Sequence, residues 1–255
     1  MAQTADPVQL KHETSDAFDA YVHEAETQMA PSLEGRAPFL WSDSSSPEWT
    51  LDVRKGRVLA RLWTGEPVRV PDGLIHDWVG AALIPGKKLK ETLAVVQDYD
   101  HHKQIYKPEV IDSKLLRRDD NHFKIYLRLL KKKFLTVVLD TDHDVQYSSL
   151  DATRWFCRSC TTRVSEVQDA GKPHEKVLPP GTGYGFLWRL NSYWRFEQRE
   201  EGVWLECRAI SLTRDVPAGL GWIIEPIVRK LPRQSLINTL AATRQAVSPK
   251  AAAAP

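Results

Sequence analysis

The chain has few cysteines and no long apolar run. Its 255 residues include only Cys157, Cys160 and Cys207, which are too few and too unevenly spaced to form a disulfide framework. No apolar stretch reaches the roughly 18 residues of a membrane-spanning helix. The first residues also lack a basic region followed by an apolar stretch, so we see no signal peptide and expect a cytoplasmic location.

The chain also has little excess of charge of one sign. The formal net charge is +2, which gives no general electrostatic reason to expect a nucleic-acid partner. The basic run Lys131–Lys133 could make transient contact with an acidic membrane surface. What the chain does have is nine tryptophans, most of them after position 150, and such a set favours a wide core or an aromatic-lined cavity.

Recognisable catalytic and metal-binding motifs are absent. We find no glycine-rich phosphate loop, no Gly-x-Ser-x-Gly elbow and no His-Glu-x-x-His run. Cys157 and Cys160 lie in a strand-like run, where residues three apart point to opposite faces, and no second pair completes a zinc site. The acidic and histidine-rich segments 98–102 and 140–144 have no recognised ligand spacing. We therefore expect solvated polar segments there, with no metal and no cofactor.

The first 73 residues are predicted to form an N-terminal helix and an irregular arm. Ser15 can cap a helix whose Phe18, Val22, Ala25 and Met29 share one face. Prolines and serines dominate residues 31–50, which indicates irregular structure, and a short strand is expected within 57–63. We expect this arm to pack across the sheet or helix and to stabilise the domain.

Residues 74–247 show a different order of elements. A strand over 74–84 is followed by helices over 89–106, by six strand-like runs and by a long helix over 223–247. The six runs are 109–117, 121–130, 134–147, 152–167, 184–198 and 203–214. Because this order is not a βαβ pattern, the sheet should be antiparallel. Pro232 should kink or divide the last helix, and residues 248–255 should be a disordered tail.

The clearest local structure is a hairpin formed by 184–198 and 203–214. A turn over 199–202 places Trp194 opposite Cys207 and Phe196 opposite Leu205 on a face that continues into Leu190 and Trp188. We expect this apolar face to meet the last helix. The other face pairs Arg195 with Glu206 and Tyr193 with Arg208, and such cross-strand pairs are favourable.

Two interpretations of the charged hairpin face stay open at this point. Because a charge pair carries a desolvation cost when it is buried, we expect the face to be solvated on the outside of the sheet. In the alternative, the face lines a polar cavity that orients the headgroup of a ligand.

The same segments resemble a known superfamily. Asp98–Val110 resembles the stretch that follows the second short helix of the START/polyketide-cyclase (SRPBCC, birch-pollen-allergen-like) proteins, although Lys107 separates Tyr106 from Pro108. Asn191–Cys207 resembles their penultimate hairpin, and Gly219–Arg244 resembles their gripping helix. The resemblance covers about 74–247. It implies an α+β helix-grip fold, in which a curved antiparallel sheet of about seven strands surrounds a long C-terminal helix, here with an N-terminal helical arm.

The resemblance also implies a pocket between sheet and helix, with a mouth gated by the loop 169–183 and the short helices over 87–106. We expect it to bind or transfer a hydrophobic or amphipathic small molecule, such as a lipid, quinone or polyketide-like compound. The candidate pocket residues are Trp188, Leu190, Trp194, Phe196, Tyr126, Tyr193, Arg195, Glu206, Arg208, Trp222, Ile223 and Ile227.

Two other functions are possible from the sequence. A cyclase or aromatase would need a positioned acid or base, for which His76, Asp77, Tyr126, Tyr193, Arg195 and Glu206 are available; we favour a protein without enzymatic activity. A non-catalytic interaction protein could instead use Phe39, Trp41 and Trp49 of the arm as anchors. The sequence does not fix the oligomeric state.

Overall fold

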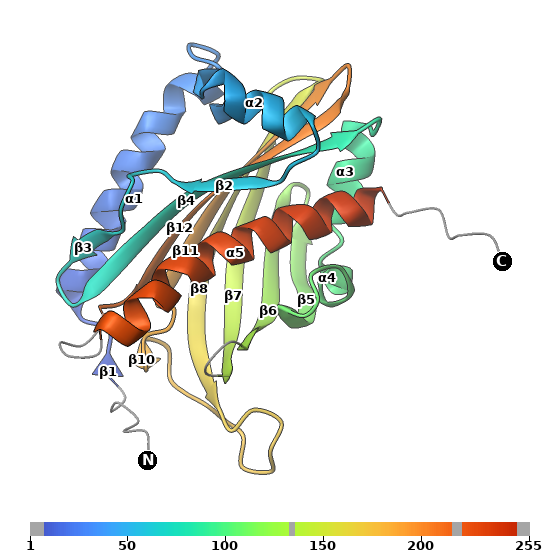
Figure 1. Ribbon diagram of the computed structural model, residues 1–255. Coiled ribbons are helices and arrows are strands. Elements are labelled where there is room, and N and C mark those ends of the chain that lie inside the picture. Colours follow the sequence, from blue (N-terminus) through green and yellow to red (C-terminus); the bar gives the residue numbers. More distant parts are fainter. Residues whose placement is uncertain (1–7, 133–135, 216–220, 249–255) are drawn as a thin grey trace.

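The computed structural model describes residues 8–132, 136–215 and 221–248, and for residues 221–230 it describes the course of the helix only. In this part of the chain one large antiparallel sheet contains ten strands (Figure 1). Its main path runs in the order β2 (Leu59–Leu62), β4 (Gly73–Pro85), β12 (Gly202–Arg214), β11 (Arg189–Arg199), β8 (Arg154–Gln168), β7 (Thr136–Ser149), β6 (His122–Lys132) and β5 (Val110–Asp119).

Short strands complete the β-structure. β3 (Val68–Val70) pairs with β4, and β9 (Lys176–Val177) pairs with β8. β1 (Val8–Gln9) and β10 (Thr182–Gly183) form a separate two-stranded ladder. Because β2 and β3 both join β4, the sheet begins before residue 74. The division of the chain at residue 73 stays a prediction.

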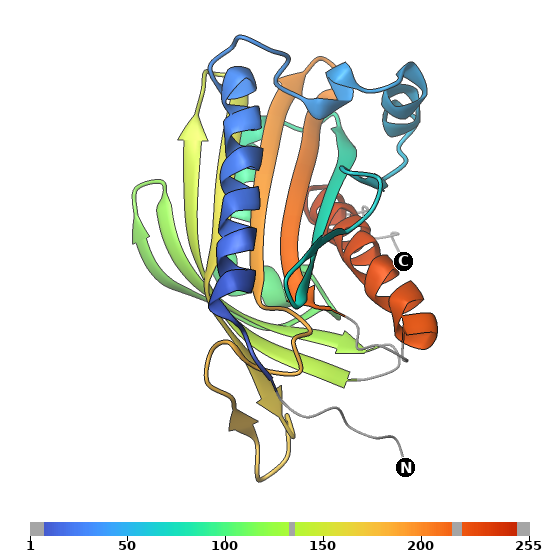
Figure 2. The ribbon, with the colours of Figure 1, turned by 90° about the vertical axis from the view of Figure 1, so that its left-hand side faces the viewer.

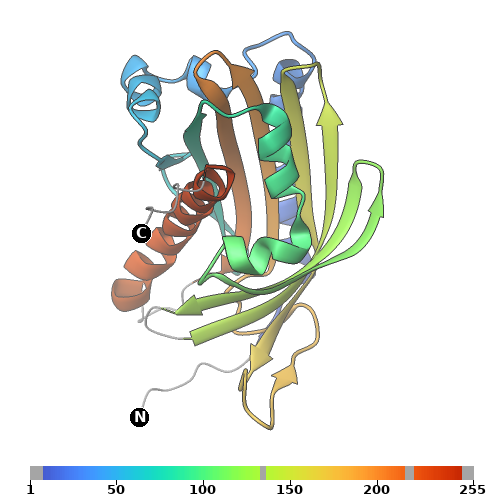
Figure 3. The same cartoon turned by 90° about the vertical axis from the view of Figure 1, so that its right-hand side faces the viewer.

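Helices cover both faces of the curved sheet. The long α5 (Gly221–Val247) lies on the concave face, and α1 (His12–Leu33) runs along the opposite face over β11 and β12 (Figures 1 and 2). The short α3 (Leu89–Val96), η2 (Tyr99–His101) and α4 (His102–Ile105) share the concave side with α5 (Figure 3). The predicted helix-grip architecture is therefore confirmed. We call the face toward α5 the inner face and the face toward α1 the outer face.

The N-terminal helix buries the predicted stripe. Phe18, Val22, Ala25 and Met29 are all buried, since a spacing of three to four residues places them on one side of the helix. The helix starts earlier than predicted, with Lys11 rather than Ser15 at the N-cap. The η1 (Trp41–Ser44) and α2 (Pro47–Arg54) turns follow it over the far end of the same face. We call residues 12–54 the N-terminal cover.

The C-terminal helix is one element, undivided at Pro232. It approaches β4 closely at Gly80, where an added Cβ would lie 2.7 Å from the Cδ1 atom of Leu240 and 3.1 Å from the Cδ2 atom of Leu236. A larger residue at this position would require the ends of these two leucine side chains to move. The absence of a side chain at Gly80 therefore lets Leu236 and Leu240 of α5 pack directly on β4.

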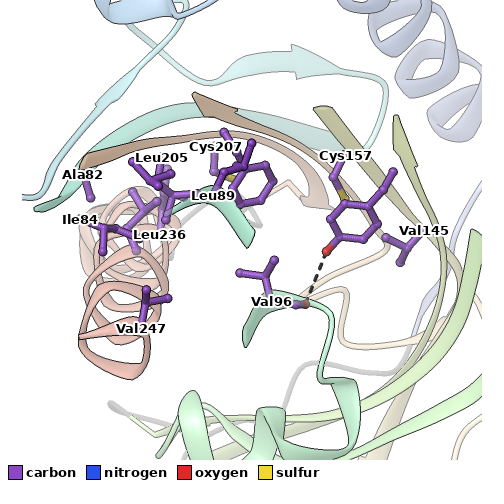
Figure 4. Close-up of a cluster of buried hydrophobic side chains, with 14 of the residues drawn as sticks. Ala82, Ile84, Leu89, Val96, Val145, Cys157, Leu205, Cys207, Leu236 and Val247 are labelled. Carbon is purple, nitrogen blue, oxygen red and sulfur yellow. Dashed lines mark hydrogen bonds between the residues drawn. The ribbon is translucent and has the colours of Figure 1, made fainter. Parts of the chain in front are cut away.

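Two faces of the sheet give separate cores. On the inner face Ala82, Ile84, Leu205 and Leu236 pack with α3 and the end of α5 (Figure 4). On the outer face the α1 stripe packs on Ile75, Val79, Ile210 and Leu212, and a third cluster under η1 and α2 contains Phe39, Leu40, Val53 and Trp204. Each face thus carries a buried core, as expected for a central sheet with helices on each side.

Candidate functional site

The β11–β12 hairpin has the register that the sequence predicts. Phe196 pairs with Leu205, Trp194 with Cys207, and Arg195 with Glu206. Because side chains alternate along a strand, the apolar pairs face α5 and the charged pairs face α1. The hairpin therefore separates two chemically different faces at the centre of the sheet.

The charged face is not solvated. Arg195 and Glu206 are each 1% exposed and Arg208 is 2% exposed. The face lies on the outer side of the sheet, as expected, but the expectation that it is solvated is wrong. The reason is the N-terminal cover, which packs over these strands and excludes water. The polar-cavity alternative also differs from this arrangement, because the charges are occupied by the chain itself.

Glu206 and Arg195 bind the cover rather than each other. The Glu206 carboxylate accepts hydrogen bonds from the backbone N–H of Trp41 at 2.6 Å, from that of Ser42 at 2.9 Å, and from the Ser42 hydroxyl. The Arg195 guanidinium donates to the Phe39 carbonyl and, at 2.8 Å, to the Ser32 hydroxyl, and it stacks 3.8 Å from the Trp41 ring. Burial raises the pKa of Glu206 and lowers the pKa of Arg195 to about 10.

A buried ion pair lies beside these two residues. Arg208 holds Asp77 with two guanidinium nitrogens, the shorter contact being 2.6 Å. The hydroxyl of Tyr21 in α1 donates to the same carboxylate at 2.8 Å, and Arg208 stacks 4.3 Å from the Trp63 ring. The polar side chains of the outer face thus have a structural role, because they hold residues 21–63 against the sheet.

The inner face is different, because it keeps accessible surface at the centre of the sheet. Ser192, Trp194 and Ala209 are partly exposed, although they lie on the two strands whose outer-face residues are almost completely buried. The strand register places further partly exposed side chains on the same inner face. They are Leu190, Ser159, Leu127 and Leu129. These side chains form a partly accessible stretch of the inner face that runs across β12, β11, β8 and β6.

A group of neutral polar side chains lies on this inner face. His143 of β7 contacts the Thr141 hydroxyl through Nε2 at 3.0 Å and the Ser159 hydroxyl through Nδ1 at 3.5 Å. Thr141 itself donates to the Leu127 carbonyl at 3.0 Å. Burial lowers the pKa of His143 to about 4, so the imidazole is neutral at pH 7.

A second polar group lies toward α3 and α4. The hydroxyls of Tyr99 and Tyr147 are 3.0 Å apart, and His102 contacts the Val96 carbonyl through Nε2 at 3.1 Å. The Tyr147 hydroxyl also points to the Val96 carbonyl (Figure 4). Burial lowers the pKa of His102 to about 4 and raises that of Tyr147 well above its ordinary value. These groups are therefore uncharged near neutral pH.

Comparison with known proteins finds similar solved structures. No family model matches the sequence, and no curated protein matches it. The STAR-related lipid transfer protein fragment of Xanthomonas axonopodis is 15% identical over 71% of this chain and 97% of that chain, with a TM-score of 0.48. The lipid transfer and protein localization domain of human StarD13 is 7% identical over 80% and 99% of the two chains, with a TM-score of 0.44.

The Zhui aromatase/cyclase from Streptomyces sp. R1128 is 10% identical over 69% of this chain and 93% of that chain, with a TM-score of 0.40. The helix-grip arrangement that the START/polyketide-cyclase resemblance implies is present in the structure itself. At these values the likeness carries nothing about ligand or activity. Among the described residues, no helix is long and apolar enough to cross a membrane.

The helix grip distributes the predicted pocket residues over both faces. Trp194, Phe196 and, by register, Leu190 are on the inner face. Trp188 is instead on the outer face with Phe18, because regular β11 pairing begins only at Arg189. The side chains of Trp222, Ile223 and Ile227 lie outside the described residues, so their pocket role stays a prediction.

The remaining candidates are on the outer face. Tyr193, Arg195, Glu206 and Arg208 lie under the N-terminal cover, and Tyr126 donates to Asp140 at 2.7 Å on the outer side of β6. Of the six acid–base candidates, His76 alone has its side chain on the inner face, where Nε2 lies 3.1 Å from the Thr213 hydroxyl.

The residues that sequence reasoning missed are Thr141, His143 and Ser159. Segment 140–144 was expected to be solvated, but successive residues along it point to opposite faces of the sheet. Asp140, Asp142 and Asp144 share the outer face, where they contact Arg128, Arg163 and His122 respectively. Thr141 and His143 point inward, which the same alternation could have indicated. No cluster of three or more metal-ligating side chains occurs within the described ranges.

Proposed function

We propose that the protein binds a hydrophobic or amphipathic small molecule between the inner face of the sheet and α5. The proposal rests on the accessible surface of Ser192, Trp194 and Ala209, which lie on the inner face of central strands whose outer-face side chains are buried. A folded protein fills its interior to high density, so interior surface that stays open suits a ligand.

The lining supports an apolar ligand. Trp194 packs parallel to Phe196 with ring centroids 6.3 Å apart, and Leu127 and Leu190 extend the apolar surface to either side. Burying such surface contributes about 25 cal/mol per Å². A lipid, quinone or polyketide-like compound has the required apolar body, and the neutral polar groups around His143 would meet its polar end.

The proposal is tested on the purified full-length chain. Native mass spectrometry should find a bound organic molecule, and solvent extraction should recover it for identification. After extraction, the neutral fluorophore N-phenyl-1-naphthylamine should bind with increased emission, and the extracted material should displace it. A protein that carries nothing and does not bind the fluorophore would refute the proposal.

A further inference from the structure

The hydrogen bonds around His143 fix which of its nitrogens carries the proton. Thr141 has one hydroxyl hydrogen, and it donates this to the Leu127 carbonyl. The Thr141 oxygen can therefore only accept from His143, so Nε2 carries the hydrogen. It follows that Nδ1 of the neutral imidazole is an acceptor with its lone pair directed toward Ser159.

That acceptor is incompletely used. The Ser159 hydroxyl lies 3.5 Å from Nδ1, whereas a well-formed hydrogen bond of this kind is roughly 2.8 Å long. Ser159 is partly exposed on the inner face, so a group that binds its hydroxyl would come close to Nδ1 of the buried His143. An oxygen about 2.8 Å from each atom would lie to one side of the line that joins them, donating to Nδ1 and accepting from the Ser159 hydroxyl.

The charged side chains of the inner face do not offer a counter-ion. The Glu166 carboxylate accepts hydrogen bonds from the backbone N–H groups of Tyr184, Gly185 and Phe186. Lys131 is paired with Glu109 and donates to Ser235 of α5. Apart from Glu166, the described charged side chains of β7, β8, β11 and β12 point outward. An ionised headgroup here would therefore be buried without a partner, which is costly.

We propose that the pair His143 and Ser159 binds the neutral hydroxyl of an apolar alcohol or phenol. This inference rests on the proposed function and names the ligand class. A hydroxyl is both donor and acceptor, which matches the two open positions. A carboxylate has no hydrogen to donate to Nδ1, so its lone pairs would face the lone pair of that nitrogen. An ammonium would bring a positive charge, and no carboxylate among the described residues is free to pair with it.

The test uses ligands that share one chain and differ at the end group. Hexadecanol, its methyl ether, palmitate and hexadecylamine compete with N-phenyl-1-naphthylamine for the full-length protein at pH 7.5. Hexadecanol should compete at least about tenfold more strongly than each of the others, since the ether lacks the donor and the two ions lack a counter-charge. Palmitate or the ether competing as well as the alcohol would overturn the inference.

Variants assign the preference to these residues. His143→Phe and Ser159→Ala should each bring the alcohol and the ether to within about threefold of one another while the fluorophore still binds. Ser159→Ala keeps the test decisive if His143→Phe does not fold. The control is Ser148→Ala, which lies three pairings along the β7–β8 ladder from Ser159 and on the opposite face. An unchanged alcohol preference in Ser159→Ala would refute the assignment. Failure of the fluorophore itself to bind wild type would instead refute the proposed function.

Discussion

Arg195 and Glu206 are direct cross-strand partners, yet no ion pair joins them within 4 Å; each is bound to a different part of the N-terminal cover. The cover therefore contributes hydrogen-bond partners to buried charges, and not only apolar packing. Removing a partner from a buried charge costs far more than removing an exposed ion pair. The stability of the sheet should thus depend on residues 12–54.

Glu206→Gln should destabilise the protein by about 2–3 kcal/mol. The amide that replaces one carboxylate oxygen has hydrogens where Trp41 and Ser42 also donate, so donors would face donors. Urea unfolding of both proteins measures the change in free energy. Glu197→Gln is the matched control, because Glu197 pairs with Arg199 nearer the surface of the same hairpin; its effect should be below about 1 kcal/mol. Equal effects of the two substitutions would contradict this role of Glu206.

Deleting residues 1–56 should prevent recovery of a folded chain. The deletion removes the donors to Glu206, the acceptors of Arg195 and the Tyr21 hydroxyl on Asp77, and it uncovers the outer apolar cluster. Size-exclusion chromatography and circular dichroism of the truncated chain are the measurements. A monomer that unfolds cooperatively and still binds N-phenyl-1-naphthylamine would show that the cover is dispensable, and would reopen an interaction role for the arm.

Acidification should destabilise the protein through its buried histidines. His102 and His143 have pKa values lowered to about 4 by burial, while an unfolded histidine titrates near 6.5. Between these values the unfolded state binds more protons, so stability falls as the pH falls from about 6.5 to 4 and is unaffected above that window. Each histidine contributes roughly 3 kcal/mol over the full window.

Comparing variants separates this effect from carboxylate titration. The loss of unfolding free energy between pH 7 and pH 4.5 should be smaller in His143→Gln than in wild type by about 2–3 kcal/mol. His23→Gln, at an exposed position of α1, should keep the wild-type loss. If His143→Gln keeps it too, the imidazole is not buried in its neutral form.

The three thiols should react slowly in the folded protein. Burial raises the pKa of Cys160 to about 11 and raises those of Cys157 and Cys207 further above the ordinary range. Because the thiolate is the reactive form, labelling by a disulfide reagent at pH 8 should be on the order of a hundredfold slower than for a free cysteine. All three should label at once in denaturant. Fast labelling of native Cys157 would mean that the inner face opens readily.

The features predicted well from sequence depend on neighbours in the chain. The β11–β12 register follows from one turn and its adjacent cross-strand pairs, and the α1 stripe follows from helical spacing. What covers each face could not be predicted in the same way, because Trp41 and Ser42 meet Glu206 across more than 160 residues. An argument from desolvation cost alone predicts that Arg195 and Glu206 face water. That prediction is wrong because the N-terminal cover supplies hydrogen-bond partners for both side chains.

Two alanines of the inner face offer the sharpest test of the open space. Ala209 is partly exposed next to Ser192, while Ala82 on the neighbouring strand is 0% exposed in the packed core. Ala209→Phe should fill free space, change the unfolding free energy by less than about 1 kcal/mol and abolish binding of N-phenyl-1-naphthylamine. Ala82→Phe should overpack the core and cost about 1–3 kcal/mol. A destabilisation by Ala209→Phe as large as that by Ala82→Phe would mean that side chains already fill the inner face and that no ligand site exists there.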